Sequence, residues 1–95
     1  MSAVIGAGRW VLRLPGCSSL KSKRQIVRSL RDRVRHRFEV SAAETSYQDE
    51  HQRTELCAVL VTSDARLADS ILNKIDALVC SDPRVYVVER ETSLL

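Results

Sequence analysis

Positive charge is concentrated in one stretch of the chain, residues 19–38. This stretch holds eight Lys or Arg residues and a single acidic residue, Asp32, so its net charge is +7. The whole chain carries +3, which leaves −4 for the remaining residues. Arginine pairs well with phosphate and carboxylate oxygens, so this uneven distribution indicates a surface that meets an anionic partner.

The apolar residues of the same stretch recur with helical spacing. Intervals of 7, 3, 4 and 4 residues place five of them on one face of a helix: Leu20, Val27, Leu30, Val34 and Phe38. Ser18 or Ser19 stands where a helix N-cap is expected. The pattern predicts a helix from about residue 19 to residue 38.

Five cations form what we call the basic stripe of this helix. At about 100° per residue they fall within about 80° of arc beside the apolar face. The stripe consists of Lys21, Arg24, Arg28, Arg31 and Arg35. A row of this kind can follow a phosphate backbone, so these residues are our candidate nucleic-acid-binding site. Two alternatives are pairing with acidic groups of the chain or of a dimer mate, and a solvated face whose side-chain stems cover the core edge.

The start of the same helix is a candidate anion site. Free backbone N–H groups and hydroxyls at a helix N-terminus can hold a phosphate or sulfate, and cations stand nearby. The residues concerned are Ser18, Ser19, Lys21 and Lys23. The alternative is that the serine serves as a cap and nothing more.

Three strands are predicted before the second helix. Trp10, Leu12 and Leu14 alternate with arginines, a period of two that predicts a strand over residues 4–14. Residues 40–47 and 54–62 read as the two strands of a hairpin, with the polar residues 48–52 as its turn.

A second helix and a last strand complete the chain. Ser63 or Asp64 caps the helix, which ends before Asp82-Pro83. Its inward residues are expected to be Leu67, Ile71, Ile75 and Leu78. Residues 84–90 predict the final strand, and residues 91–95 a loose C-terminal tail.

The predicted order is therefore β-α-β-β-α-β in a single domain spanning residues 1–95. With right-handed crossovers this order gives an α+β, ferredoxin-like βαββαβ fold. Its sheet has four antiparallel strands, and both helices cover the same face. Ninety-five residues leave no room for a second independent core.

The uncovered face of that sheet is expected to be apolar. In residues 56–61 and 85–88 both alternating sets of side chains are apolar, whereas a solvated sheet face is normally polar. A second copy of the chain is the simplest cover, so we expect a homodimer through the open face. The alternative is that the C-terminal tail folds over it.

Three blocks of sequence resemble a known family. After Pro15-Gly16 come residues 19–24 (Ser-Leu-Lys-Ser-Lys-Arg), then 38–44 (Phe-Glu-Val-Ser-Ala-Ala-Glu) and 48–53 (Gln-Asp-Glu-His-Gln-Arg). In order and spacing they resemble the YlxP-like family of small bacterial proteins, classed as a domain of unknown function. The resemblance runs from Gly6 to about Glu91.

The resemblance implies a ferredoxin-like fold and no established enzymatic activity. It also implies a ribosome-maturation context, because genes of this family often neighbour those for a translation initiation factor and for ribosome-binding factor A. The chain departs from the family's usual residues at Glu39, His51 and Thr54, and the second of these lies in the hairpin turn.

No residue pattern predicts an enzyme, a metal site or a cofactor. Cys17, Cys57 and Cys80 have neither disulfide-framework nor metal-ligand spacing, so we expect reduced thiols in a cytoplasmic protein without a membrane segment. Cys17 precedes a helix but has no assisting base placed by sequence. The acidic residues and histidine of the hairpin turn are explained by the turn itself.

The expected function is that of a non-enzymatic protein associated with RNA or the ribosome through the basic stripe. Base stacking on the sheet, as in an RRM, is not expected, because residues 56–61 contain no aromatic residue. The alternative is a dimeric protein-interaction module whose basic helix binds an acidic protein.

Overall fold

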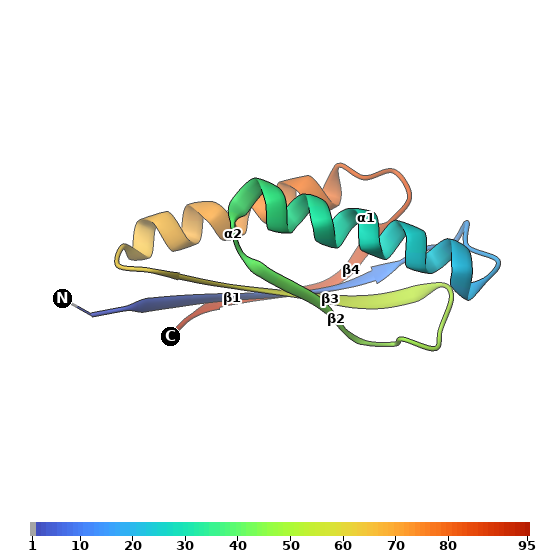
Figure 1. The fold of residues 1–95 in the computed structure, drawn as a ribbon, viewed down its shortest axis with the longest axis horizontal. Coiled ribbons are helices and arrows are strands. Elements are labelled where there is room, and N and C mark those ends of the chain that lie inside the picture. The colour runs from blue at the N-terminus through green and yellow to red at the C-terminus, as the bar shows by residue number, and fades with distance from the viewer. Residues whose placement is uncertain (1) are drawn as a thin grey trace.

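The computed structural model describes residues 2–95 and has the predicted element order. The elements are β1 (Val4–Arg13), α1 (Leu20–Phe38), β2 (Ser41–Ser46), β3 (Arg53–Thr62), α2 (Ala65–Cys80) and β4 (Tyr86–Leu94). The four strands form one antiparallel sheet in the order β2-β3-β1-β4. Figure 1 shows both helices on the same side of this sheet. The α+β, ferredoxin-like prediction is confirmed.

The core lies between the sheet and the two helices. Trp10 and Leu12 of β1 and Leu14, directly after it, face the helices, and Leu56, Ala58 and Leu60 do so from β3; all six are buried. Their even spacing is the period of two that sequence alternation predicts. The helices contribute Val27, Leu30 and Val34 from α1 and Leu72, Ile75 and Val79 from α2.

Local signals fix where α1 begins and ends. Ser19 is the N-cap, and its hydroxyl oxygen accepts a hydrogen bond from the backbone N–H of Ser22 at 3.1 Å. Glu39 adopts a left-handed conformation with φ of 52°, and its N–H donates to the carbonyl of Arg35 at 3.0 Å. The helix therefore has 19 residues and presents its basic stripe over about 21 Å, from residue 21 to residue 35.

A glycine and a tryptophan make the close contact beneath α2. A Cβ atom at Gly8 would lie 2.3 Å from the ring of Trp10, so only glycine lets the indole lie flat against the strand. The indole N–H of Trp10 donates to Asp76 of α2 at 3.0 Å. The only tryptophan is thus a core residue on the helix-covered face.

The C-terminal tail differs from its prediction. Residues 91–94 continue β4, which pairs with β1 as far as Leu94 opposite Gly6. Leu95 exchanges backbone hydrogen bonds with Ile5 of 2.7 and 3.2 Å. The strand was not predicted beyond residue 90 because residues 89–93 are polar. An edge strand with exposed side chains, however, needs few apolar residues. The tail therefore does not cover the open face.

One predicted core residue is also wrong. Leu67 is 49% exposed, because it lies in the first turns of α2, beyond the point where α1 ends. Ile75 and Leu78 are buried as predicted, and Ile71 is partly buried. None of the helices described over residues 2–95 is long and apolar enough to cross a membrane.

Candidate nucleic-acid interface

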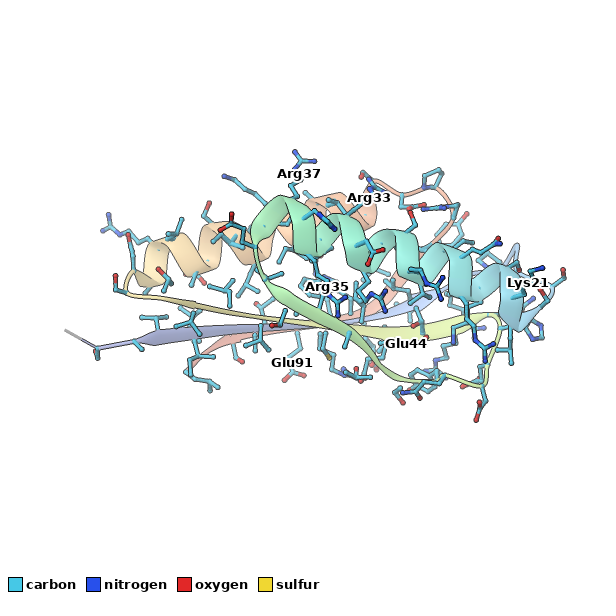
Figure 2. All side chains as sticks on the ribbon, viewed as in Figure 1. Lys21, Arg33, Arg35, Arg37, Glu44 and Glu91 are labelled. Carbon is cyan, nitrogen blue, oxygen red and sulfur yellow. The ribbon has the colours of Figure 1, made fainter. Side chains whose placement is uncertain are left out.

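The basic stripe lies along the free edge of the sheet. Its members are exposed, except for a half-buried Arg31, and they lie on the side of α1 that overhangs the edge strand β2. Arg35, at the far end, borders a shallow cavity of about 540 Å³ together with Val40 and residues 41–43 of the edge strand. Figure 2 shows Arg35 on this side of α1, with Arg33 and Arg37 on its upper side and Lys21 near the other end. The stripe is thus one continuous surface.

Four members of the stripe have no ionic partner. Over residues 2–95, no carboxylate oxygen lies within 4.0 Å of the charged groups of Lys21, Arg24, Arg28 or Arg35. Arg31 contacts only its sequence neighbour Asp32, at 3.2 Å and on the surface. Such a surface pair contributes little to stability, and the other four cations of the stripe keep their charge uncompensated within the described chain.

The opposite side of α1 behaves differently. Arg33 lies 3.4 Å from the carboxylate of Asp82, a buried residue that also binds Arg84 at 2.7 Å. The hydrogen bond from Arg84 is the main cause that lowers the pKa of Asp82, and Arg33 adds to it. This arginine therefore has a structural partner within the fold.

Lys23 corrects the predicted anion site. Its side chain is 1% exposed, and its ammonium group donates to the carbonyl oxygen of Tyr47 at 2.6 Å and lies 2.9 Å from the carboxylate of Glu44. The hydroxyl of Thr54 donates to the same carboxylate. Lys23 stands four residues before Val27, on the buried face of α1, and this spacing is the signal that would have identified it.

Of the remaining residues of that site, Ser19 has a role within the fold, as the helix cap. Ser19 uses its side chain to cap the helix, while Ser18 and Lys21 are exposed beside it. A helix N-terminus with its cap in place is no evidence for a ligand. With Lys23 turned inward, the structure does not bring the four predicted residues together.

The buried lysine joins the basic helix to the β2–β3 hairpin turn. Tyr47, whose carbonyl it binds, has a left-handed φ of 61° at the start of the turn. The guanidinium of Arg53 lies over the Tyr47 ring, 4.3 Å from its centroid. Gln52 joins the turn to the β1–α1 loop through two hydrogen bonds. Its side-chain N–H donates to the backbone carbonyl of Cys17 at 3.1 Å, and its backbone carbonyl accepts from the backbone N–H of Leu14 at 3.0 Å. These contacts fix the hairpin turn to α1 and to the β1–α1 loop.

The turn's acidic residues and histidine do not form a catalytic arrangement. Asp49, Glu50 and His51 are exposed, and within the described chain no hydrogen bond joins the imidazole to either carboxylate. They border a cavity of about 340 Å³ with Arg13 and Arg53. The explanation of these residues by the turn stays a prediction.

The open face of the sheet carries exposed aliphatic residues at one end, whereas toward the hairpin turn it exposes Tyr86, opposite Arg13. Val61, which is 71% exposed, and Val59 lie opposite Ile5 and Ala7. Toward the hairpin turn the face becomes charged. There Arg9 binds Glu55 at 2.6 Å and Glu89 at 3.2 Å.

Three charged groups of the open face, Arg9, Glu55 and Glu89, are paired with one another, whereas Arg13 and Arg53 have no carboxylate within 4.0 Å among residues 2–95. A hydrogen bond from Thr45 at 2.7 Å is the main cause that lowers the pKa of Glu55. The surface left for a second copy is therefore smaller than expected, and the homodimer stays a prediction.

The three cysteines are free; Cys57 lies 3.1 Å from the hydroxyl of Thr45, and the thiol of Cys80 lies 3.9 Å from the carboxylate of Asp76. Cys17 is buried, and burial is the main cause that raises the pKa of the Cys80 thiol. Among residues 2–95, no three His, Cys, Asp or Glu side chains come together in a way that could hold a metal ion.

Three comparisons place the chain among known proteins. The family model described as "Protein of unknown function (DUF503)" matches residues 5–92. The chain is 34% identical over 67 residues to "Uncharacterized protein YlxP" of Bacillus subtilis (strain 168), an alignment that covers 70% of this chain and 73% of that protein.

A solved structure shares the fold. "De novo designed protein Foldit4" superposes with a TM-score of 0.54 over 97% of each chain at 14% sequence identity, a level at which only the fold is shared. The family match spans nearly the whole domain, from the first strand to the last. The chain belongs to the DUF503 family of proteins of unknown function, as its resemblance to YlxP-like proteins predicted.

Proposed function

We propose that this protein is a non-enzymatic RNA-binding protein that holds the phosphate backbone of RNA along the basic stripe of α1. The ribosome, with its folded RNA, is the context that the family resemblance implies. The observation that carries the proposal is that four of the five cations of the stripe have no carboxylate partner within residues 2–95. Acidic groups of the fold pair with other cations instead.

The shape of the stripe favours a helical RNA over a single strand. Five cations spaced three or four residues apart on one straight helix form a rigid row about 21 Å long. Duplex RNA offers a regular backbone to such a row, and proteins read it by shape and phosphate contacts. A single strand would gain less, because it binds chiefly by stacking its bases on aromatic side chains.

No aromatic side chain stands beside the stripe to stack a base. Trp10 is buried, and Tyr47 already lies against Arg53. Phe38 is partly buried at the end of α1, where it faces α2. Tyr86 is 63% exposed but lies on β4, the opposite edge of the sheet from β2. The chemistry available at the stripe is therefore limited to backbone contacts, which carry little sequence preference.

Charge reversal at the centre of the stripe tests the proposal. The triple variant Arg24→Glu, Arg28→Glu and Arg31→Glu should weaken binding to a short fluorescein-labelled RNA duplex about 100-fold or more in fluorescence anisotropy. Its circular dichroism spectrum should stay that of the parent, because Arg24 and Arg28 are exposed and the half-buried Arg31 is paired only with the surface residue Asp32 among residues 2–95.

A second triple variant supplies the matched control. Arg13→Glu, Arg66→Glu and Lys74→Glu change the net charge by the same amount at exposed positions off the stripe. This control should lose far less affinity than the stripe variant. Equal losses would mean that overall charge, and no particular surface, attracts RNA. Retention by the parent of an acidic protein after nuclease treatment, without duplex affinity, would favour the alternative partner.

We also propose that two copies associate through the apolar end of the open face. Sedimentation equilibrium should give a dimer for the parent chain and a monomer for Val61→Asp, which places a charge on an apolar residue of that end that is 71% exposed. A parent chain that remains monomeric at high concentration would exclude this assembly without affecting the RNA proposal.

A further inference from the structure

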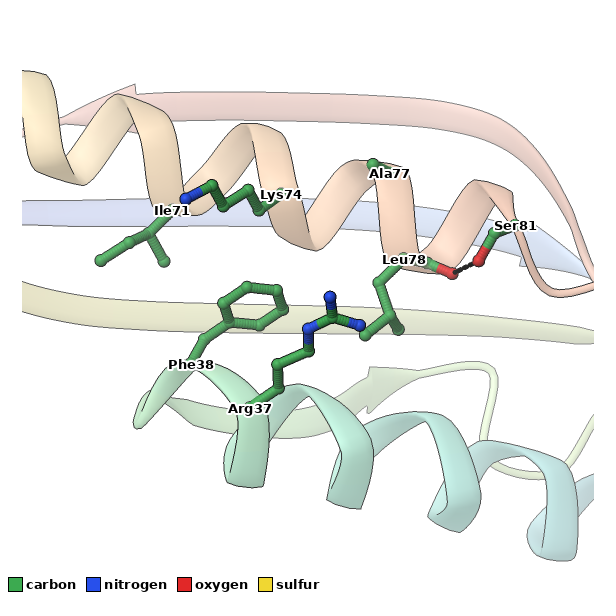
Figure 3. A pocket seen from close by; sticks show the side chains of 7 residues that line it. All are labelled: Arg37, Phe38, Ile71, Lys74, Ala77, Leu78 and Ser81. Atoms are coloured by element: carbon green, nitrogen blue, oxygen red, sulfur yellow. Dashed lines mark hydrogen bonds between the residues drawn. The ribbon is translucent and has the colours of Figure 1, made fainter.

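A groove between the two helices carries a second, different surface. It is a cavity of about 510 Å³ between the last turn of α1 and the second half of α2. Phe38, Ile71 and Leu78 form its apolar floor, and Arg37 and Lys74 stand at its rim (Figure 3). The basic stripe borders the other side of α1, so the two surfaces do not share a residue.

The rim cations of this groove have no internal partners. No carboxylate lies within 4.0 Å of Arg37 or Lys74 anywhere in the described chain, and neither Asp nor Glu lines the cavity. The nearest interaction of the Arg37 guanidinium is with the Phe38 ring, 5.8 Å from its centroid. One turn earlier on the same helix, Arg33 is engaged by Asp82. The groove thus combines an apolar floor with uncompensated positive charge.

The apolar floor continues along α2 past the end of α1. Leu67, Ile71 and Leu78 lie on one face of α2, since their spacings of 4 and 7 residues are helical repeats. Because α1 ends at Phe38, no helix covers the first turns of α2, and Leu67 is left 49% exposed. Leu67 and Ile71 give this strip about one turn of accessible apolar surface. Lys74 comes next on the same face, and Leu78, which is 6% exposed, contributes only at the groove floor.

We propose that this groove binds an acidic amphipathic helix of a partner protein. Leu67, Ile71 and Phe38 take apolar side chains from successive turns of such a helix, and Arg37 and Lys74 pair with carboxylates beside its apolar face. A phosphate backbone would bury no apolar surface on this floor. The helices of a second copy are packed on their own sheet, and α1 is itself strongly basic. The partner is therefore a different chain.

The proposal is tested with a pair of synthetic helical peptides. Both carry leucine at three-turn helical spacing; in one the flanking residues are glutamate, and in the other they are lysine. We expect the glutamate peptide to bind the full chain at least about tenfold more tightly than the lysine peptide. Binding is followed by fluorescence anisotropy, and its location by chemical-shift changes at the groove floor in NMR spectra.

A charge swap provides the decisive control. The variant Arg37→Glu and Lys74→Glu should reverse the preference, losing the glutamate peptide and gaining the lysine peptide, while its affinity for the RNA duplex stays close to that of the parent. Because both residues are exposed, the variant should fold. The proposal is overturned if the preference does not reverse, or if the shift changes map to the basic stripe. Neither outcome bears on the RNA proposal, which is tested separately by the stripe variant.

Discussion

Two sets of cations on the same helix have opposite environments. Lys23 and Arg33 have carboxylate partners inside the fold, Glu44 at 2.9 Å and Asp82 at 3.4 Å. The four free members of the basic stripe, only a few residues away, have none within residues 2–95. The chain contains enough acidic residues to pair more of them, since it has 12 against 15 basic ones.

The two environments distinguish cations that are paired within the fold from cations whose charge is free to bind a ligand. Both carboxylates that pair with the first set lie at least partly buried, where an unpaired charge is costly, so those pairs are needed by the fold. The stripe faces solvent, where cations need no partner but repel one another at helical spacing. We therefore expect an anionic ligand to relieve that repulsion, and removal of the stripe to leave the fold intact. The following predictions test this division.

The largest effect is expected at the buried pair. Glu44→Ala leaves the ammonium of Lys23 buried without its carboxylate and should lower the free energy of unfolding by about 3 kcal/mol or more. The double variant Lys23→Met and Glu44→Leu removes both charges and should recover most of that loss. Urea titrations of the three variants measure this. A small effect of Glu44→Ala would mean that Lys23, like the stripe residues, needs no carboxylate partner in the fold.

Asp82 should give a smaller effect that depends on pH. Its carboxylate accepts hydrogen bonds from the backbone N–H and the guanidinium of Arg84, each at 2.9 Å, so Asp82→Asn should cost about 2 kcal/mol at pH 7. The pKa of Asp82 is lowered in the folded state, chiefly by the hydrogen bond from Arg84. Its contribution is therefore present above the unfolded-state pKa of about 3.9 and is lost as the pH falls through the folded-state value.

The parent and the Asp82→Asn variant should accordingly converge in stability in acid. Thermal unfolding followed between neutral pH and about pH 2 checks the trend. A difference that stays constant over this range would show that the carboxylate charge contributes nothing, and that only its hydrogen-bond geometry matters.

The smallest stability effect is expected on the stripe itself. Arg28→Gln removes one free cation that has stripe neighbours three and four residues away, so stability should change by no more than about 0.5 kcal/mol and in the favourable direction. Affinity for the RNA duplex should fall in the same variant. A clear loss of stability would mean that Arg28 has a structural role, which would weaken the comparison.

Sequence reasoning predicted the fold better than the roles of individual charges. The element order, the N-cap region of α1 and the buried faces of the strands follow from periodicity and capping, which are local properties. The continuation of the last strand through Glu91 and Ser93 was missed, because a polar edge strand is defined by its pairing with β1 and not by its own composition.

The role of a cation depends on contacts that are distant in sequence. Lys23 meets Glu44 across 21 positions, and Arg33 meets Asp82 across 49. Spacing on the helix could have placed Lys23 on the buried face, beside Val27, but not its partner. The groove with Arg37 and Lys74 was also beyond prediction, because it exists only where α1 ends next to α2.

The salt dependence of duplex RNA binding tests the central claim most directly. If the free stripe cations neutralise phosphates, the logarithm of the association constant should fall against the logarithm of salt concentration with a slope of about −4. The slope should become much shallower in the triple variant at Arg24, Arg28 and Arg31. A parent slope near zero, or an equal slope in parent and variant, would contradict the assignment of the stripe as the RNA-binding surface.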